Sequence, residues 1–145
     1  MTKKVYIIED DELTSKMITK VIDTYFDDIE VIGSNQNGQS GVGECVKLNS
    51  DLAIVDIRLP DVNGLEILHI LKRRHPHMKV LIYSGILNLN EIKRAHQGMA
   101  DGIIEKSEGI EELKSAIEAI VSGRSYYSPI VTEQLLQYEV ISLES

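Results

Sequence analysis

The chain has 145 residues, of which 43% are hydrophobic and 26% charged, and its formal net charge is −8. This length and composition are typical of one globular domain and exclude a disordered segment. The negative charge disfavours a phosphate-backbone binder, which needs a basic face, so we expect no nucleic-acid contact by this chain itself. A single cysteine, Cys45, excludes an internal disulfide. No apolar run approaches the roughly 20 residues that cross a bilayer, so we expect a cytoplasmic protein with no membrane segment.

Short apolar runs alternate with longer amphipathic segments along the chain. A short, continuous apolar run is typical of a strand that is buried on both faces of a parallel sheet. Such runs predict strands at residues 5–8, 29–33, 52–56, 80–83 and 102–104. A helical pattern follows each of them, at residues 13–25, 41–48, 64–75, 90–99 and 110–121. This alternation predicts an α/β fold, a doubly wound five-stranded parallel sheet with helices on both faces.

Within the first helical segment, apolar residues recur every four positions. We expect this stripe to face the core, with Ile18 and Ile22 beside it; its members are Leu13, Met17, Val21 and Tyr25. The third helix has a start signal, because Asn63 at the N-cap and Glu66 three residues later form a capping-box pattern.

The segment after Arg124 has a different composition, with no Lys or Arg from Ser125 to the end. Ser128 followed by Pro129 predicts a helix start. The helix carries an apolar stripe that includes Val131 and Leu135. Two interpretations remain open: a helix that packs back on the domain, or a linker or dimer helix.

Polar residues follow the predicted strands at the points where the strands end. Glu9 and Asp10 follow the first strand, Asp56 ends the third, Ser84 follows the fourth, and Lys106 lies just beyond the fifth. In a parallel sheet these positions meet at one edge, where ligands bind. Clustered carboxylates repel one another and suit Mg²⁺, while a hydroxyl and an amine suit an anion. Together they indicate phosphoryl transfer, and a carboxylate can take the phosphoryl group covalently. Considered without the other strand-end residues, Asp56 would more often be a helix-capping residue than a nucleophile.

Several short motifs in this order resemble the receiver domain of two-component response regulators. They are Ile8-Glu9-Asp10-Asp11, Val55-Asp56, Leu59-Pro60-Asp61 before Asn63-Gly64, Tyr83-Ser84-Gly85, Ala100-Asp101-Gly102 and Glu105-Lys106. The Lys-Ser ending and the stretch from Gly123 to Pro129 resemble the NarL/FixJ subfamily, whose receivers precede a LuxR-type domain. The resemblance implies a flavodoxin- or CheY-like sheet of order 2-1-3-4-5. It also implies a receiver domain at residues 1–123 and a C-terminal linker or helix at 124–145, with the effector domain absent.

The resemblance also implies a Mg²⁺ site at the strand edge. Asp10 and Asp56 would ligate the ion directly, together with the backbone carbonyl of Arg58. Glu9 would hold it through a water. We interpret the Arg58 side chain in one of two ways: it is a solvated loop residue, or it tunes hydrolysis of the phosphoaspartate.

The same resemblance implies that Asp56 is the phosphoacceptor, taking its phosphoryl group from a phosphohistidine of a sensor histidine kinase. Ser84 would bond a phosphoryl oxygen and Lys106 would pair with the phosphoryl charge. The new charge would rearrange the fourth helix, fifth strand and fifth helix. We expect no enzyme in the ordinary sense, only self-phosphorylation and self-dephosphorylation.

The sequence departs from the family pattern at two places near Lys106. Ile103 stands where the family usually has a switch aromatic, and Ser107 replaces a proline that is often cis. The expected output is transcription control through a LuxR-type domain outside this chain. The alternatives are a stand-alone receiver or a pseudo-receiver acting through protein contacts, and a Mg²⁺-dependent phosphohydrolase. A homodimer could form through the fourth helix, fifth strand and fifth helix, or through the C-terminal helix.

Overall fold

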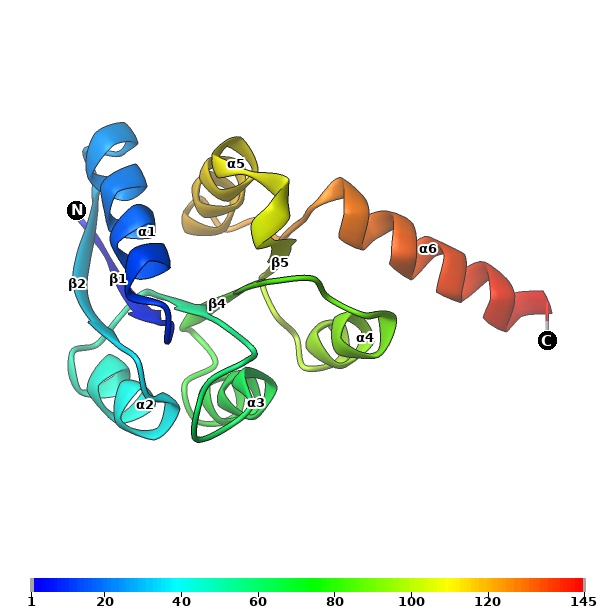
Figure 1. Cartoon of the computed structure of the whole chain (residues 1–145), viewed down its shortest axis with the longest axis horizontal. Coiled ribbons are helices and arrows are strands. Elements are labelled where there is room, and N and C mark those ends of the chain that lie inside the picture. Colours follow the sequence, from blue (N-terminus) through cyan, green and yellow to red (C-terminus); the bar gives the residue numbers. More distant parts are fainter. Residues whose placement is uncertain (1, 145) are drawn as a thin grey trace.

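The structure, a computed structural model, describes residues 2–144, and side chains through residue 139. Its centre is a parallel sheet of six strands in the order β2-β1-β3-β4-β5-β6 (Figure 1). The strands are β1 Lys3–Ile8, β2 Ile29–Asn35, β3 Leu52–Val55, β4 Lys79–Ser84, β5 Gly102–Glu105 and β6 Tyr126–Tyr127. The predicted doubly wound sheet and its strand order are confirmed. The structure adds β6, a two-residue strand at the edge that the sequence pattern did not indicate.

Helices cover both faces of the sheet. They are α1 Glu12–Tyr25, α2 Gly38–Lys47, α3 Gly64–Arg74, α4 Leu89–Gln97, α5 Ile110–Val121 and α6 Pro129–Glu144, with a 3₁₀ turn, η1, at Lys106–Glu108. Figure 1 shows α1 and α5 on one side and α2, α3 and α4 on the other, while α6 extends away from the sheet on the side of β5. Among the residues that the structure describes, no helix combines the length and apolarity that spanning a bilayer requires.

The strands divide their side chains between two cores, one on each face. In β1, Val5 and Ile7 pack against α1 and α5, whereas Tyr6 and Ile8 pack toward α2 and α3. All four are fully buried. Since alternate residues of a strand point to opposite faces, a strand covered on both sides has to be apolar throughout. This accounts for the unbroken apolar runs in the sequence.

The predicted core stripe of α1 is wrong at its two ends. Leu13 and Tyr25 are 76% and 54% exposed, and the buried residues are Ser15, Ile18, Val21 and Ile22. An α-helix has 3.6 residues per turn, so a line of every fourth residue drifts by about 40° per step. The ends of the stripe are therefore turned away from the sheet, and the buried line follows spacings of three and four.

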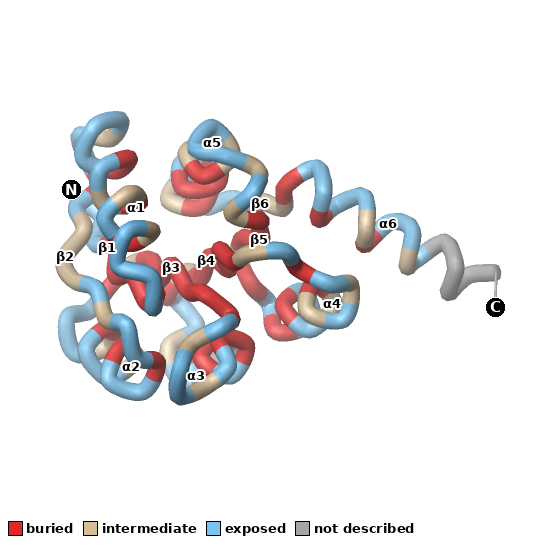
Figure 2. Tube along the Cα trace, viewed as in Figure 1, coloured by how far each residue is buried: buried red, intermediate tan, exposed pale blue. Residues whose placement is uncertain are grey.

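The start of α6 packs back on the sheet. Ser128 N donates to Ile103 O at 3.2 Å, which continues the β5–β6 pairing into the helix start. Val131 is fully buried and Leu135 is 9% exposed, and both belong to the core beneath α4. Figure 2 shows this pattern, with buried positions near the start of the helix and exposed surface around them. The packed-back interpretation therefore holds for the first turns of α6, and the side chains beyond residue 139 lie outside the described residues.

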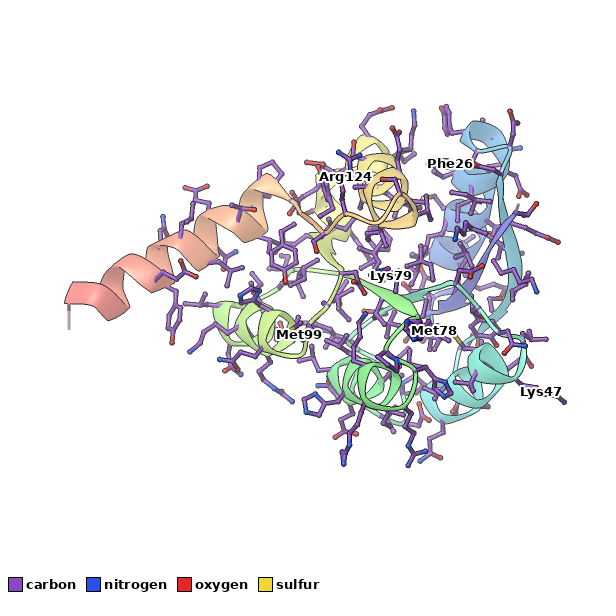
Figure 3. The ribbon with its side chains drawn as sticks, turned by 180° about the vertical axis from the view of Figure 1, so that it is seen from behind. Phe26, Lys47, Met78, Lys79, Met99 and Arg124 are labelled. Carbon is purple, nitrogen blue, oxygen red and sulfur yellow. The ribbon has the colours of Figure 1, made fainter. Side chains whose placement is uncertain are left out.

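The connections that lead from helices into strands lie at the amino ends of the strands, opposite the site described below. Figure 3, seen from behind, labels several of them: Phe26 after α1, Met78 before β4, Met99 after α4 and Arg124 after α5. The polar residues proposed for the site lie at the opposite, carboxyl ends of the strands, either in the connections that follow the strands or, for Ser84, at the last position of β4. The connections at the amino ends of the strands are therefore structural turns, and the candidate site lies at the carboxyl ends.

Candidate functional site

Strand register brings the predicted residues together at the carboxyl edge of the sheet. Ile8 of β1 pairs with Val55 of β3, so the next residues, Glu9 and Asp56, are neighbours. Asp56 N donates to Ile8 O at 3.0 Å, which fixes this junction. Ser84 pairs with Glu105, the residue before Lys106. The sheet thus gathers all the side chains that the sequence proposed for this edge.

Asp56 is the centre of the cluster and is only 4% exposed. Its Oδ1 accepts hydrogen bonds from Ser84 Oγ at 2.6 Å and from Arg58 N at 3.2 Å, and its Oδ2 accepts one from Lys106 Nζ at 3.1 Å. Burial by itself would raise the pKa of Asp56, but the hydrogen bond from Ser84 and the charge and hydrogen bond of Lys106 outweigh it and lower the pKa. The carboxylate is therefore ionised at neutral pH, as a nucleophile requires.

Lys106 pairs with two carboxylates at once. Its Nζ lies 2.7 Å from Glu9 Oε1 and 3.1 Å from Asp56 Oδ2. Burial favours neutral Lys106, but the bond to Glu9 and the charge of Asp56 raise its pKa, so the ammonium persists. Burial raises the pKa of Glu9 to about 7, against the opposing effect of Lys106. At neutral pH Asp56 is therefore an anion and Lys106 a cation, whereas Glu9 is close to its pKa.

The three acidic residues fit a small divalent cation. Glu9, Asp10 and Asp56 each place one carboxylate oxygen within 4.8 Å of the others. Glu9 Oε1 is buried and accepts no hydrogen bond of good geometry, its partner being the Lys106 ammonium. Mg²⁺ prefers oxygen ligands and keeps part of its water shell. This cluster offers carboxylate oxygens, and its exposed residue, Asp10, leaves access for water. The ligand set is therefore compatible with the predicted metal, and the role of the Arg58 carbonyl stays a prediction.

The Arg58 side chain is not simply solvated. Its guanidinium donates to Ser84 Oγ at 3.2 Å, to Ile86 O at 3.1 Å and to Glu91 Oε1 at 3.0 Å. Glu91 also accepts from Asn88 N at 3.0 Å, as part of the capping box that starts α4. Arg58 therefore links the hydroxyl that contacts Asp56 to the first turn of α4. The sequence carried no signal of this, because the contacts cross between two loops.

Gly64 is a second residue whose role at the site the sequence did not show. A Cβ at this position would lie 2.1 Å from the backbone oxygen of Asp56. Gly64 N donates to Ile57 O at 2.8 Å, which folds the loop back on the end of β3. Asn63 caps α3 by accepting from Leu65 N at 2.8 Å. Asn63 therefore caps α3 as predicted, but the described residues show no reciprocal bond to the Glu66 side chain, so the predicted capping box is not formed. Gly64 permits the close turn at the end of β3.

The structure shows what surrounds Ile103 and Ser107, the two residues near Lys106 that differ from the family pattern. Ile103 is fully buried in β5, and Tyr127 of β6 is its register partner. Tyr127 OH lies 2.8 Å from His96 Nδ1 of α4. No cis peptide occurs in the described chain, and Lys106 opens the 3₁₀ turn η1 instead. In place of an aromatic from β5, Tyr127 of β6 therefore contacts α4.

Fold and site together define a receiver domain. Residues 5–118 match the family described as the response regulator receiver domain, and the chain belongs to this family. It is a receiver domain of a response regulator in two-component signalling.

Two curated relatives and one solved structure illustrate the similarity. The response regulator GacA of Pseudomonas syringae pv. syringae (strain B728a) is 28% identical over 132 residues, which are 91% of this chain and 61% of GacA. The response regulator protein VraR of Staphylococcus aureus (strain NCTC 8325) is 28% identical over 131 residues, 90% of this chain and 62% of VraR. The chain thus spans about three fifths of these relatives. A LuxR-family two-component response regulator from Aurantimonas sp. SI85-9A1 has the same fold, with a TM-score of 0.89 and 21% identity over 97% of this chain and 99% of that one.

Proposed function

We propose that this chain accepts a phosphoryl group on Asp56 from a phosphohistidine of a sensor histidine kinase, in a Mg²⁺-dependent reaction. The observation that carries the proposal is the geometry around Asp56: a buried, ionised carboxylate that contacts Ser84 and Lys106 beside two further acids. Each of these side chains has a function in phosphoryl transfer that follows from its chemistry.

In this reaction a carboxylate oxygen of Asp56 attacks phosphorus. The new bond is O–P, and the bond that breaks is P–N of the phosphohistidine, whose imidazole leaves with the electron pair and takes up a proton. When bound, Mg²⁺ would neutralise charge on the transferring oxygens. In the unphosphorylated chain Ser84 Oγ donates to Asp56 Oδ1 and Lys106 Nζ donates to Asp56 Oδ2. After transfer we expect both groups to donate to phosphoryl oxygens instead.

The proposed output is a rearrangement of α4, β5 and α5 that leads to transcription control through a LuxR-type DNA-binding domain. The support is the similarity to a solved DNA-binding response regulator of the LuxR family from Staphylococcus aureus, with a TM-score of 0.75 and 25% identity over 80% of this chain. This chain also spans only about three fifths of the response regulators GacA and VraR. A second copy of the chain is a further proposed partner, through the α4–β5–α5 surface or α6. The alternative is a stand-alone receiver or pseudo-receiver that acts through protein contacts.

The proposal includes self-phosphorylation and slow self-dephosphorylation but no turnover of an external substrate. Incubation with acetyl phosphate and Mg²⁺ separates it from a phosphohydrolase. We expect about one protein-bound phosphoryl group per chain and slow release of inorganic phosphate. Rapid, continuing release of phosphate without accumulation of the protein adduct would favour the hydrolase.

A further inference from the structure

The turn that carries Lys106 is held on both sides by carboxylates. Glu105 is 5% exposed; its Oε2 accepts from Leu87 N at 2.8 Å, and its Oε1 from Ser107 Oγ at 3.2 Å. Glu108 Oε1 accepts from Glu105 N at 2.9 Å, which completes a reciprocal capping box around η1. Because side-chain bonds close this three-residue turn at both ends, a displacement of the Lys106 backbone would strain the bonds that Glu105 and Glu108 make.

Glu108 has a second partner at the start of α6. Ser128 Oγ donates to Glu108 Oε1 at 2.5 Å, across 20 residues of sequence. Ser128 is fully buried, and its Oγ also accepts from Val131 N at 3.4 Å, as expected of the helix N-cap. The Glu108 carboxylate therefore holds the N-terminal turn of α6, where a negative charge is also favoured by the helix dipole.

Capping of η1 alone does not account for this arrangement. To cap η1, Glu108 needs to accept only the hydrogen bond from Glu105 N. The additional hydrogen bond from Ser128 Oγ connects the start of α6 to η1. Ser128 N also donates to Ile103 O at 3.2 Å, so the start of α6 is fixed at two points, Ile103 of β5 and Glu108 of η1. One of them, Glu108, lies two residues from the lysine at the proposed phosphoryl site.

We propose that Glu108 is a positioning residue that couples the state of the Asp56 site to α6. The proposal rests on the proposed function, because its signal is the phosphoryl group. That group carries a charge of about −1.5 to −2 in place of the single negative charge of the carboxylate, and it gives the Lys106 ammonium new oxygens to contact. Movement of Lys106 strains the bonds that close η1, which changes the bond from Ser128 to Glu108. The N-terminal turn of α6 then changes its stability, and α6 is the element that leads toward the C-terminus.

Hydrogen exchange of the full chain tests the tether first without any phosphodonor. In Glu108→Ala we expect the amides of Val131 and Thr132 to exchange about tenfold faster than in the wild type, as expected for loss of one charge-assisted hydrogen bond. Ser128→Ala should give the same direction. Glu108→Gln, whose amide oxygen can still accept both bonds, should stay closer to the wild type. Glu111→Ala is the matched control, since Glu111 is exposed and, among the residues that the structure describes, pairs only with Lys114 within α5. Unchanged exchange in Glu108→Ala would overturn the tether.

The second arm adds Mg²⁺ and beryllofluoride, with occupancy followed by fluorine NMR. We expect exchange over residues 129–135 to change in the wild type and in Glu111→Ala, to change less in Glu108→Ala at equal occupancy, and to be rescued in part by Glu108→Gln. A response of equal size in Glu108→Ala would overturn the coupling, as would an occupied wild type with no response in α6. Absence of beryllofluoride binding would instead contradict the proposed function and the coupling with it, while the first arm still decides whether the tether exists.

Discussion

Asp56 combines burial with a low pKa because its neighbours supply more stabilisation to the anion than burial removes. Ser84 and Lys106 contribute from β4 and from the turn after β5, so the ionised state depends on the register of the whole sheet. The sequence predicted these contacts because strand ends in a parallel sheet converge. It could not predict the guanidinium of Arg58 on Ser84, since that contact depends on how two loops fold toward each other.

Asp10 provides a test of the metal site at the level of one side chain. It is the exposed member of the acidic cluster. Without metal, Asp10→Asn should raise the free energy of unfolding by about 0.5 kcal/mol, because one like charge is removed. With saturating Mg²⁺ the wild type should gain thermal stability by mass action, and the variant should gain much less. Thermal melts across a Mg²⁺ titration measure both effects. Equal stabilisation of wild type and variant by Mg²⁺ would remove Asp10 from the ligand set.

At the scale of elements, the start of α2 depends on a residue from another loop. Its own N-cap, Asn37, makes no side-chain cap bond. Asp61 from the β3–α3 loop instead accepts from Gly38 N at 2.8 Å and from Gln39 N at 2.9 Å. The bond from Gln39 is the largest contribution that lowers the pKa of Asp61. The sequence placed Asp61 in a loop motif but could not assign it to α2, because the cap comes from a segment 22 residues away.

This cap predicts a pH-dependent contribution to stability. The pKa of Asp61 is lower in the folded chain than the ordinary value of about 3.9, so the contribution is complete above that value and is lost as pH falls through the folded pKa. Asp61→Ala should therefore lower the melting temperature at pH 7, and the difference from the wild type should shrink below about pH 4. Asp27→Ala is a control outside this contact. A difference that stays constant down to acid pH would show that the charge of Asp61 does not carry the effect.

For the whole molecule, the sequence left the place of the C-terminal segment open for a physical reason. An apolar stripe on a helix fits packing on its own domain and packing on another surface equally well. A strand as short as Tyr126–Tyr127 has no period to detect, so β6 could not be predicted either. By contrast, the five longer βα units were predictable, because buried strands have to be continuously apolar.

The packing of α6 predicts an asymmetry between two apolar residues of the same helix. Val131 is fully buried in the core, whereas Leu136 is 56% exposed. Val131→Ala should lower the free energy of unfolding by about 2 kcal/mol through lost burial and the remaining cavity. Leu136→Ala should change it by less than about 0.5 kcal/mol. Urea denaturation followed by circular dichroism measures both. Similar small effects for the two variants would mean that α6 is not part of the folded unit.

The most direct test of phosphorylation at Asp56 is the mass of the intact chain after incubation with acetyl phosphate and Mg²⁺, followed by peptide mapping. The matched variants are Asp56→Asn, which removes the proposed acceptor, and Asp51→Asn, which changes a carboxylate just before the opposite end of β3. We predict addition of one phosphoryl group to the wild type and to Asp51→Asn, mapped to Asp56 and dependent on Mg²⁺, and none to Asp56→Asn. An unmodified wild type, or equal modification of Asp56→Asn, would show that Asp56 is not the phosphoacceptor.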